Sequence, residues 1–243
     1  MIVDETHDAD RRSWVESANA AGTDFPIQNL PLCIFHNDGH GPRGGIGIGD
    51  QILDLKAASK LGLFSGDAAQ AAEAACEATL NSLMAMGPRY SSALRRRVSQ
   101  LLSTDAEGEP AKANRERLLV PMTQAQLELP AFIHSFSDFT SSVDHTKRLR
   151  GHIPDVLMRL PVAYHGRASS IRLDGTPVLR PYGQFKAADE SSAYGPEPRL
   201  DFELEFAAFV GMPSTLGEPV PVRDAAEHIF GFVLLNDWSA RGI

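Results

Sequence analysis

The sequence is poor in several kinds of residue, and each scarcity argues against a class of protein. Only two of the 243 residues are cysteine, Cys33 and Cys76, which excludes a disulfide scaffold and predicts a reducing, cytoplasmic location. No apolar run reaches the length of about 18 residues that a membrane-spanning helix needs. Lysine and arginine number 23 against 31 aspartates and glutamates, and the formal net charge of −8 predicts neither a nucleic-acid nor a membrane partner.

The residues that are present describe a folded chain of one large domain or two ordinary ones. Hydrophobic residues make up 43% and charged residues 22%, which is enough apolar material for a packed core. Residues 1–24 are polar and predict an extension with little structure of its own. That extension is acidic, so it is not typical of a secretory signal.

In the first half of the chain, the spacing of the apolar residues changes from a strand pattern to a helical one. Proline-punctuated apolar residues predict a strand over 25–35, the glycines predict a turn over 39–45, and isoleucines around Gly49-Asp50 predict a hairpin over 46–53. Alanines and apolar residues at helical spacing then predict one helix over 69–86, stopped by Gly87-Pro88, and a second over 90–102.

The second half is rich in strand patterns. We expect strands over 161–167 and 200–210, and the continuous apolar run over 229–235 predicts a strand buried on both faces.

An alternating segment, Asp201–Phe206, carries the most informative group of carboxylates. Side chains two residues apart in a strand share a face, so Glu203 and Glu205 lie side by side with Asp201 next to them. Adjacent carboxylates repel each other and attract a cation, and their oxygens suit Mg²⁺ or Ca²⁺ better than zinc or copper. The other interpretation is a strand with one solvated acidic face.

Two further segments offer acidic and basic groups. Asp237 follows the apolar run directly, so it is either a site residue at the end of a strand or the N-cap of a following helix. Residues 136–145 place Asp138, several hydroxyls and His145 in a stretch that we expect to be irregular. That stretch holds either a general base or only a polar loop with a surface histidine.

Several blocks spread through the chain are more specific than these patterns. They are FPIQNLP (25–31), IGDQILDL (48–55), RLPVAYHGRASS (159–170), DFELE (201–205) and NDWSAR (236–241). In this order they resemble the fumarylacetoacetase family, most specifically at 159–170 and 236–241.

The resemblance implies a mostly β fold with helices. Residues 25–125 correspond to a small SH3-like barrel domain with helices, following the polar extension 1–24. Residues 126–243 correspond to the N-terminal part of a mixed β-roll domain that forms a homodimer. The implied reaction is metal-dependent hydrolysis of a carbon–carbon bond in fumarylacetoacetate, giving fumarate and acetoacetate in the last step of tyrosine breakdown.

The resemblance also assigns roles to individual positions. The residues at the family's metal-ligand positions, for Mg²⁺ and/or Ca²⁺, are Asp138, Glu203, Glu205 and Asp237. His145 stands at the general-base position. The residues at substrate-binding positions are Thr140, Arg150 and Tyr164.

The sequence departs from the family pattern at three places. Thr140 replaces a tyrosine, the stretch between His145 and Arg150 is shorter, and Gly242 replaces an aspartate. The family also continues beyond Ile243, where it carries a lysine, a glutamine and the glutamate partner of the histidine. We therefore expect either a hydrolase of which this chain is a fragment, or an impaired remnant that binds a full-length copy. A relative acting on another acylpyruvate-like substrate is a further alternative.

Overall fold

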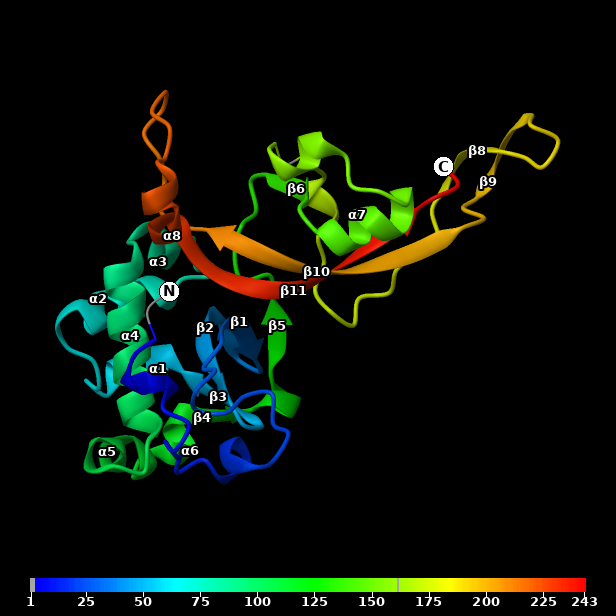
Figure 1. Ribbon diagram of the computed structural model, residues 1–243. Coiled ribbons are helices and arrows are strands. Elements are labelled where there is room, and N and C mark those ends of the chain that lie inside the picture. Colours follow the sequence, from blue (N-terminus) through cyan, green and yellow to red (C-terminus); the bar gives the residue numbers. More distant parts are fainter. Residues whose placement is uncertain (1–2, 161) are drawn as a thin grey trace. The chain divides into compact units, whose positions relative to one another are not determined.

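The computed structural model describes residues 3–160 and 162–243, in two compact units (Figure 1). The first unit comprises the chain up to Pro130 and from Gly175 to Ile243, and the second comprises Ala131–Asp174. Pro161, the first residue of the strand predicted over 161–167, lies outside the described residues. In the described ranges, no helix is both long enough and apolar enough to cross a bilayer.

The first unit contains a five-stranded antiparallel sheet. Its strands are β1 (Leu32–Asn37), β2 (His40–Ile48), β3 (Gln51–Asp54), β4 (Leu119–Pro121) and β5 (Gln126–Glu128). They pair in the order β4-β3-β2-β1-β5, and the end strands β4 and β5 do not pair in the described part of the chain. The sheet is therefore open in the described part of the chain, with no closed barrel there, and the predicted fold of strands with helices is confirmed.

The predicted hairpin around Gly49-Asp50 is confirmed as the connection between β2 and β3. Two neighbouring expectations were wrong. The strand predicted over 25–35 begins only at Leu32, after Pro31, a residue without an N–H to donate to a ladder. The turn predicted over 39–45 is confined to Asp38-Gly39, because β2 already begins at His40 and pairs with β1 from there on.

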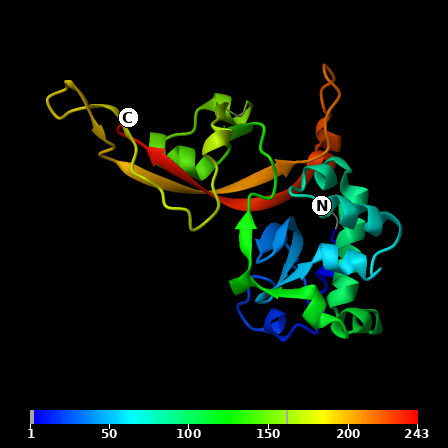
Figure 2. The same cartoon turned by 180° about the vertical axis from the view of Figure 1, so that it is seen from behind.

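Helices lie along one side of this sheet in both views (Figures 1 and 2). They are α1 (Leu55–Lys60), α2 (Gly66–Ala75), α3 (Asn81–Ala85), α4 (Pro88–Leu102), α5 (Glu109–Lys112) and α6 (Arg115–Leu118). The core between sheet and helices contains fully buried side chains such as Phe35, Ile48, Leu53, Leu94 and Leu101.

The helix predicted over 90–102 is confirmed as α4, with Pro88 in its first turn and Gly87 at its N-cap. The single helix predicted over 69–86 is wrong, because it is divided into α2 and α3. The Leu80 N–H donates to the Pro130 carbonyl at 2.7 Å instead of continuing the helical ladder. A contact from a distant segment therefore overrides the local periodicity.

The polar segment before the sheet is more structured than predicted. It forms short 3-10 helices at Glu5–His7 and Glu16–Asn19, and it buries Val15 and Ala18. The Trp14 indole N–H donates to the Leu101 carbonyl at 2.8 Å, and the Ser13 hydroxyl donates to the Leu102 carbonyl at 2.7 Å. These bonds hold the segment against the end of α4.

The rest of the first unit consists mainly of two hairpins. Their strands are β8 (Tyr182–Lys186) with β9 (Ser192–Pro196), and β10 (Leu200–Val210) with β11 (Ile229–Ala240), which follows α8 (Ala225–His228). The prediction of β10 is confirmed. The run over 229–235 is a strand as predicted, but it is not buried on both faces, since Leu234 is 75% exposed.

The second unit pairs β6 (Phe136–Thr140) with β7 (Val162–Gly166), and α7 (Val143–Arg150) lies between them in the sequence. The irregular stretch expected over 136–145 is thus a strand followed by the start of a helix. Ser142 caps this helix by accepting a hydrogen bond from the His145 N–H at 3.2 Å, and Gly151 ends it with a φ of 73°. The remaining 3-10 helices of the chain are Ala106–Gly108, Met122–Gln124, Asp155–Met158, Ala168–Ser170 and Val222–Asp224.

Candidate metal centre

The register of β10 and β11 gathers carboxylates on one face of the hairpin. Glu203 pairs directly with Asp237, and the neighbouring pairs are Asp201 with Ser239 and Glu205 with Leu235. Directly paired residues point to the same face of an antiparallel ladder. Asp237 therefore joins the alternating carboxylates Asp201, Glu203 and Glu205 that the sequence placed on one face.

Glu205 and Asp237 bring two carboxylates of this group close together within the first unit. A carboxylate oxygen of each lies within 4.8 Å of the other, and both residues are half-buried. Asp237 lies within the strand and not at its end, and it does not cap a helix, because β11 continues to Ala240. Its role as a site residue stays a prediction. The pair offers hard oxygen donors, so its chemistry fits Mg²⁺ or Ca²⁺.

Arg241 is a charged residue on this face that the sequence analysis did not assign. Its Nε donates to the Asp201 carboxylate at 2.6 Å, and its terminal nitrogen donates to the Glu203 carboxylate. The hydrogen bond from Arg241 lowers the pKa of Asp201, and the same bond raises the pKa of Arg241. A signal in the sequence could have revealed the role of Arg241. Side chains alternate between the two faces of a strand, so Arg241, four residues after Asp237, is expected on the same face as Asp237.

The second unit brings together two other predicted site residues. Asp138 on β6 pairs directly with Tyr164 on β7, and the Tyr164 hydroxyl donates to the Asp138 carboxylate at 2.5 Å. Thr140 lies two residues further along β6, on the same face as Asp138, and is exposed. On the opposite face, the Ser137 hydroxyl lies 3.2 Å from the His165 Nδ1.

His145 and Arg150 both lie on α7 but do not share a face. His145 is the third residue of the helix and is half-buried, whereas Arg150 is its last residue and is exposed. Five residues of α-helix turn through about 500°, which leaves the two side chains roughly 140° apart. The helix therefore positions a histidine and an arginine in different directions.

These features define a mixed α/β protein with a carboxylate-rich strand pair whose oxygens suit a hard divalent cation. Comparison with known proteins narrows the class to a family. Residues 28–130 match the family model described as fumarylacetoacetase N-terminal, and residues 134–243 match the model described as fumarylacetoacetate (FAA) hydrolase C-terminal. The chain belongs to the fumarylacetoacetate hydrolase family.

Curated relatives support this membership along most of the chain. The chain is 42% identical to the fumarylacetoacetase of Oryza sativa subsp. japonica, over 96% of this chain and 57% of the relative. It is 43% identical to that of Rattus norvegicus and 42% identical to that of Homo sapiens, each over 92% of this chain and 56% of the relative. The chain thus spans just over half the length of the curated relatives that it matches.

Proposed function

We propose that this protein is a metal-dependent hydrolase that cleaves a carbon–carbon bond of fumarylacetoacetate to release fumarate and acetoacetate. The relatives that bear the name fumarylacetoacetase support the substrate. The observation that carries the proposal is the carboxylate pair of Glu205 and Asp237. Glu205 lies in the DFELE block (201–205) of the family resemblance, and Asp237 lies in the NDWSAR block (236–241).

The proposed metal ligands are Glu205 and Asp237 together with Asp138 and Glu203. Four carboxylates suit Mg²⁺ or Ca²⁺, which both prefer oxygen donors. When bound, such a cation supplies Lewis-acid polarisation and orients the substrate's diketone oxygens. Glu203 joins the ligand set by releasing the Arg241 guanidinium, with which it forms an ion pair.

The remaining site residues act on the substrate and on water. His145 takes a proton from the attacking water, so that the hydroxyl is added to the acyl carbon that becomes the fumarate carboxylate. The proton is delivered to the carbon that leaves as acetoacetate. Arg150 pairs with a substrate carboxylate, because its guanidinium can donate two parallel hydrogen bonds. Thr140 and Tyr164 line the substrate pocket.

The proposal includes a cytoplasmic homodimer. The family resemblance supports the dimer, and the presence of only two cysteines supports a reducing compartment. Sedimentation velocity of the purified protein tests the dimer directly, and a single species with the mass of one chain at every concentration contradicts it.

The metal assignment is tested by calorimetric titration of the protein with Mg²⁺ and with Ca²⁺. We expect Glu205→Gln and Asp237→Asn each to weaken binding by at least about tenfold, because each removes one charged oxygen ligand. Asp189→Asn is the matched control, since Asp189 is exposed in the β8–β9 connection and accepts hydrogen bonds from the backbone N–H and the hydroxyl of Ser191. Unchanged affinity in both site variants contradicts the assignment.

The hydrolase assignment is tested separately with fumarylacetoacetate. We expect release of fumarate and acetoacetate that stops on chelation of divalent cations. His145→Ala is expected to lower turnover by about a hundredfold or more while metal binding stays unchanged, since a general base contributes rate rather than ligand oxygens. Metal binding without turnover in the unsubstituted protein contradicts the proposed activity.

A further inference from the structure

Arg241 binds a carboxylate that the proposed metal centre needs. Its terminal nitrogen donates to Glu203, and its Nε donates to Asp201 at 2.6 Å. The Arg241 and Glu203 side chains are 30% and 26% exposed, so solvent screens their ion pair only in part. Because arginine stays protonated in proteins, a change of pH does not release Glu203 from this positive charge.

Glu203 is bonded differently from the two neighbouring candidate ligands. It pairs directly with Asp237 in the ladder and shares a face with Glu205. Carboxylate oxygens of Glu205 and Asp237 lie within 4.8 Å of each other, but Glu203 does not complete a group of three with them at that distance. The Glu203 carboxylate is bonded to the Arg241 guanidinium instead. A cation that takes Glu203 as a ligand must therefore displace Arg241.

The backbone around Arg241 is held by the segment that precedes β10. The Arg241 N–H donates to the Arg199 carbonyl at 3.3 Å, and the Gly242 N–H donates to the Glu197 carboxylate at 2.9 Å. The same Glu197 oxygen accepts from the Arg199 N–H at 2.5 Å, and Glu197 is buried. A Cβ at position 242 would lie 2.6 Å from this oxygen, so the contact requires a glycine there. Glu197 thus fixes the chain on the far side of Arg241 from the ladder.

We propose that Arg241 competes with the metal ion for Glu203, and that Glu197 is the residue that positions Arg241 for this competition. The inference rests on the metal centre proposed above. Without a cation, the guanidinium reduces the repulsion between Asp201 and Glu203. An arriving divalent cation is repelled by the same positive charge and must separate it from Glu203. Arg241 therefore lowers the affinity of the centre for Mg²⁺ or Ca²⁺.

The competition is tested by calorimetric titration of the full chain with Mg²⁺ and with Ca²⁺ at fixed ionic strength. We expect Arg241→Gln to tighten cation binding by about fivefold or more, because the substitution removes a positive charge and frees Glu203. An arginine that merely orders the acidic face would support binding instead. Unchanged or weaker binding by the variant therefore overturns the proposal.

The same titration separates this inference from the proposed function. Cation binding by the unsubstituted chain without a gain in Arg241→Gln overturns the inference alone. If neither cation binds to the unsubstituted chain or to any variant, the inference and the proposed metal centre are both overturned.

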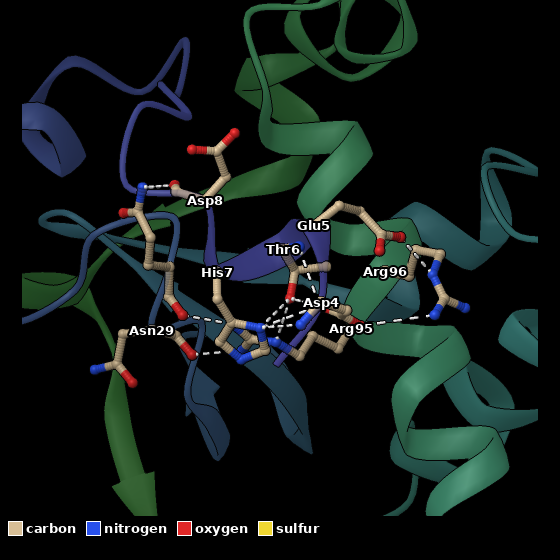
Figure 3. Close-up of polar contacts among 9 residues, drawn as sticks. Asp4, Glu5, Thr6, His7, Asp8, Asn29, Arg95 and Arg96 are labelled. Atoms are coloured by element: carbon tan, nitrogen blue, oxygen red, sulfur yellow. Dashed lines mark hydrogen bonds and ion pairs between the residues drawn. The ribbon is translucent and has the colours of Figure 1, made fainter. Parts of the chain in front are cut away.

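Arg96→Gln is the matched control. Like Arg241, Arg96 joins two carboxylates: its Nε donates to Glu5 at 2.7 Å, and a terminal nitrogen lies 3.6 Å from the Asp4 carboxylate (Figure 3). Neither acid is a proposed metal ligand, and the net charge changes as much as in Arg241→Gln, so we expect unchanged cation affinity. An equal gain in the two variants shows a general effect of charge and overturns the proposal.

The positioning role of Glu197 is tested with and without Arg241. Glu197→Ala removes the acceptor of the two N–H groups, and we expect it to tighten cation binding by about twofold or more, because Arg241 is then held less firmly. In the Arg241→Gln background the same substitution is expected to have no further effect. Glu197→Gln keeps an oxygen acceptor and is expected to bind like the unsubstituted chain.

Glu197→Asp provides a second probe if the alanine variant does not fold. It keeps the charge but is one methylene shorter, so we expect the same gain in cation affinity as in Glu197→Ala. No gain in the variant that folds, or an equal gain with and without Arg241, overturns the positioning role.

Discussion

Arg43 and Asp54 form an ion pair inside the first unit, where their side chains are only 6% and 11% exposed. Arg43 donates from Nε to Asp54 at 2.7 Å and from a terminal nitrogen to the Asn37 side chain at 2.8 Å, and it lies over the Phe35 ring. Asp54 also caps α1 by accepting from the Ala57 N–H at 3.0 Å. One charge pair thus joins strand, helix and aromatic core.

We expect Arg43→Met to lower the free energy of unfolding by about 3–5 kcal/mol, because it leaves the Asp54 carboxylate buried without its counter-charge. Urea unfolding followed by circular dichroism measures the change. Arg89→Met is the matched control. Arg89 pairs with Asp67 at 2.7 Å but is 74% exposed, so its loss is expected to leave the unfolding midpoint unchanged. Equal effects of the two substitutions contradict the assigned role of the buried pair.

The two cysteine thiols are expected to be chemically inert in the folded chain. Burial raises the pKa of Cys33 from 9.0 to about 12, and burial also raises the pKa of Cys76. A raised pKa means less thiolate at every pH below it, and the thiolate is the reactive form. Cys76→Ser isolates Cys33, whose reaction with a disulfide reagent at about pH 8 is expected to be slow in buffer and fast in urea. Rapid reaction in buffer is the contrary result.

At the scale of elements, the packing of α2 on β2 depends on the absence of a side chain at Gly44. A Cβ at this position meets the Ala75 backbone carbonyl at less than 3.0 Å, a separation that real Cβ atoms essentially never show. We expect Gly44→Ala to destabilise the chain by about 1–3 kcal/mol, because strand and helix must separate to admit the methyl group. Gly41→Ala in the same strand is the control, since a Cβ there has nothing within 4 Å. Urea midpoints of the two variants test the difference, and a stable Gly44→Ala chain refutes it.

At the scale of the whole molecule, metal binding is expected to shift global unfolding. A cation that binds the folded chain and not the unfolded one stabilises it by about 2.7 kcal/mol at a concentration of 100 times its Kd. Mg²⁺ or Ca²⁺ is therefore expected to raise the Tm measured by calorimetry, and a chelator to reverse the rise. Glu205→Gln is expected to reduce the shift. A Tm that stays the same with Mg²⁺ and with Ca²⁺ contradicts the candidate metal centre.

The sequence by itself determined much of the local structure. The period of two over residues 200–210 placed Glu203 and Glu205 on one face, and Gly49-Asp50 marked the hairpin, because turn chemistry and side-chain alternation act over a few residues. The specific blocks at 159–170 and 236–241 indicated the family. The sequence patterns also predicted α4 within two residues of its observed start.

Only the tertiary structure decided which distant residues meet. The division of the helix over 69–86 depends on the hydrogen bond from the Leu80 N–H to the Pro130 carbonyl, 50 residues away in the sequence. The position of Asp237 within a strand, and the pairing of Arg241 with Asp201 and Glu203, depend on the register of β11 against β10. The local period of the sequence determines on which face of its own strand a side chain lies. Hydrogen bonding between distant segments sets the register, and the register determines which residues of the partner strand that side chain meets.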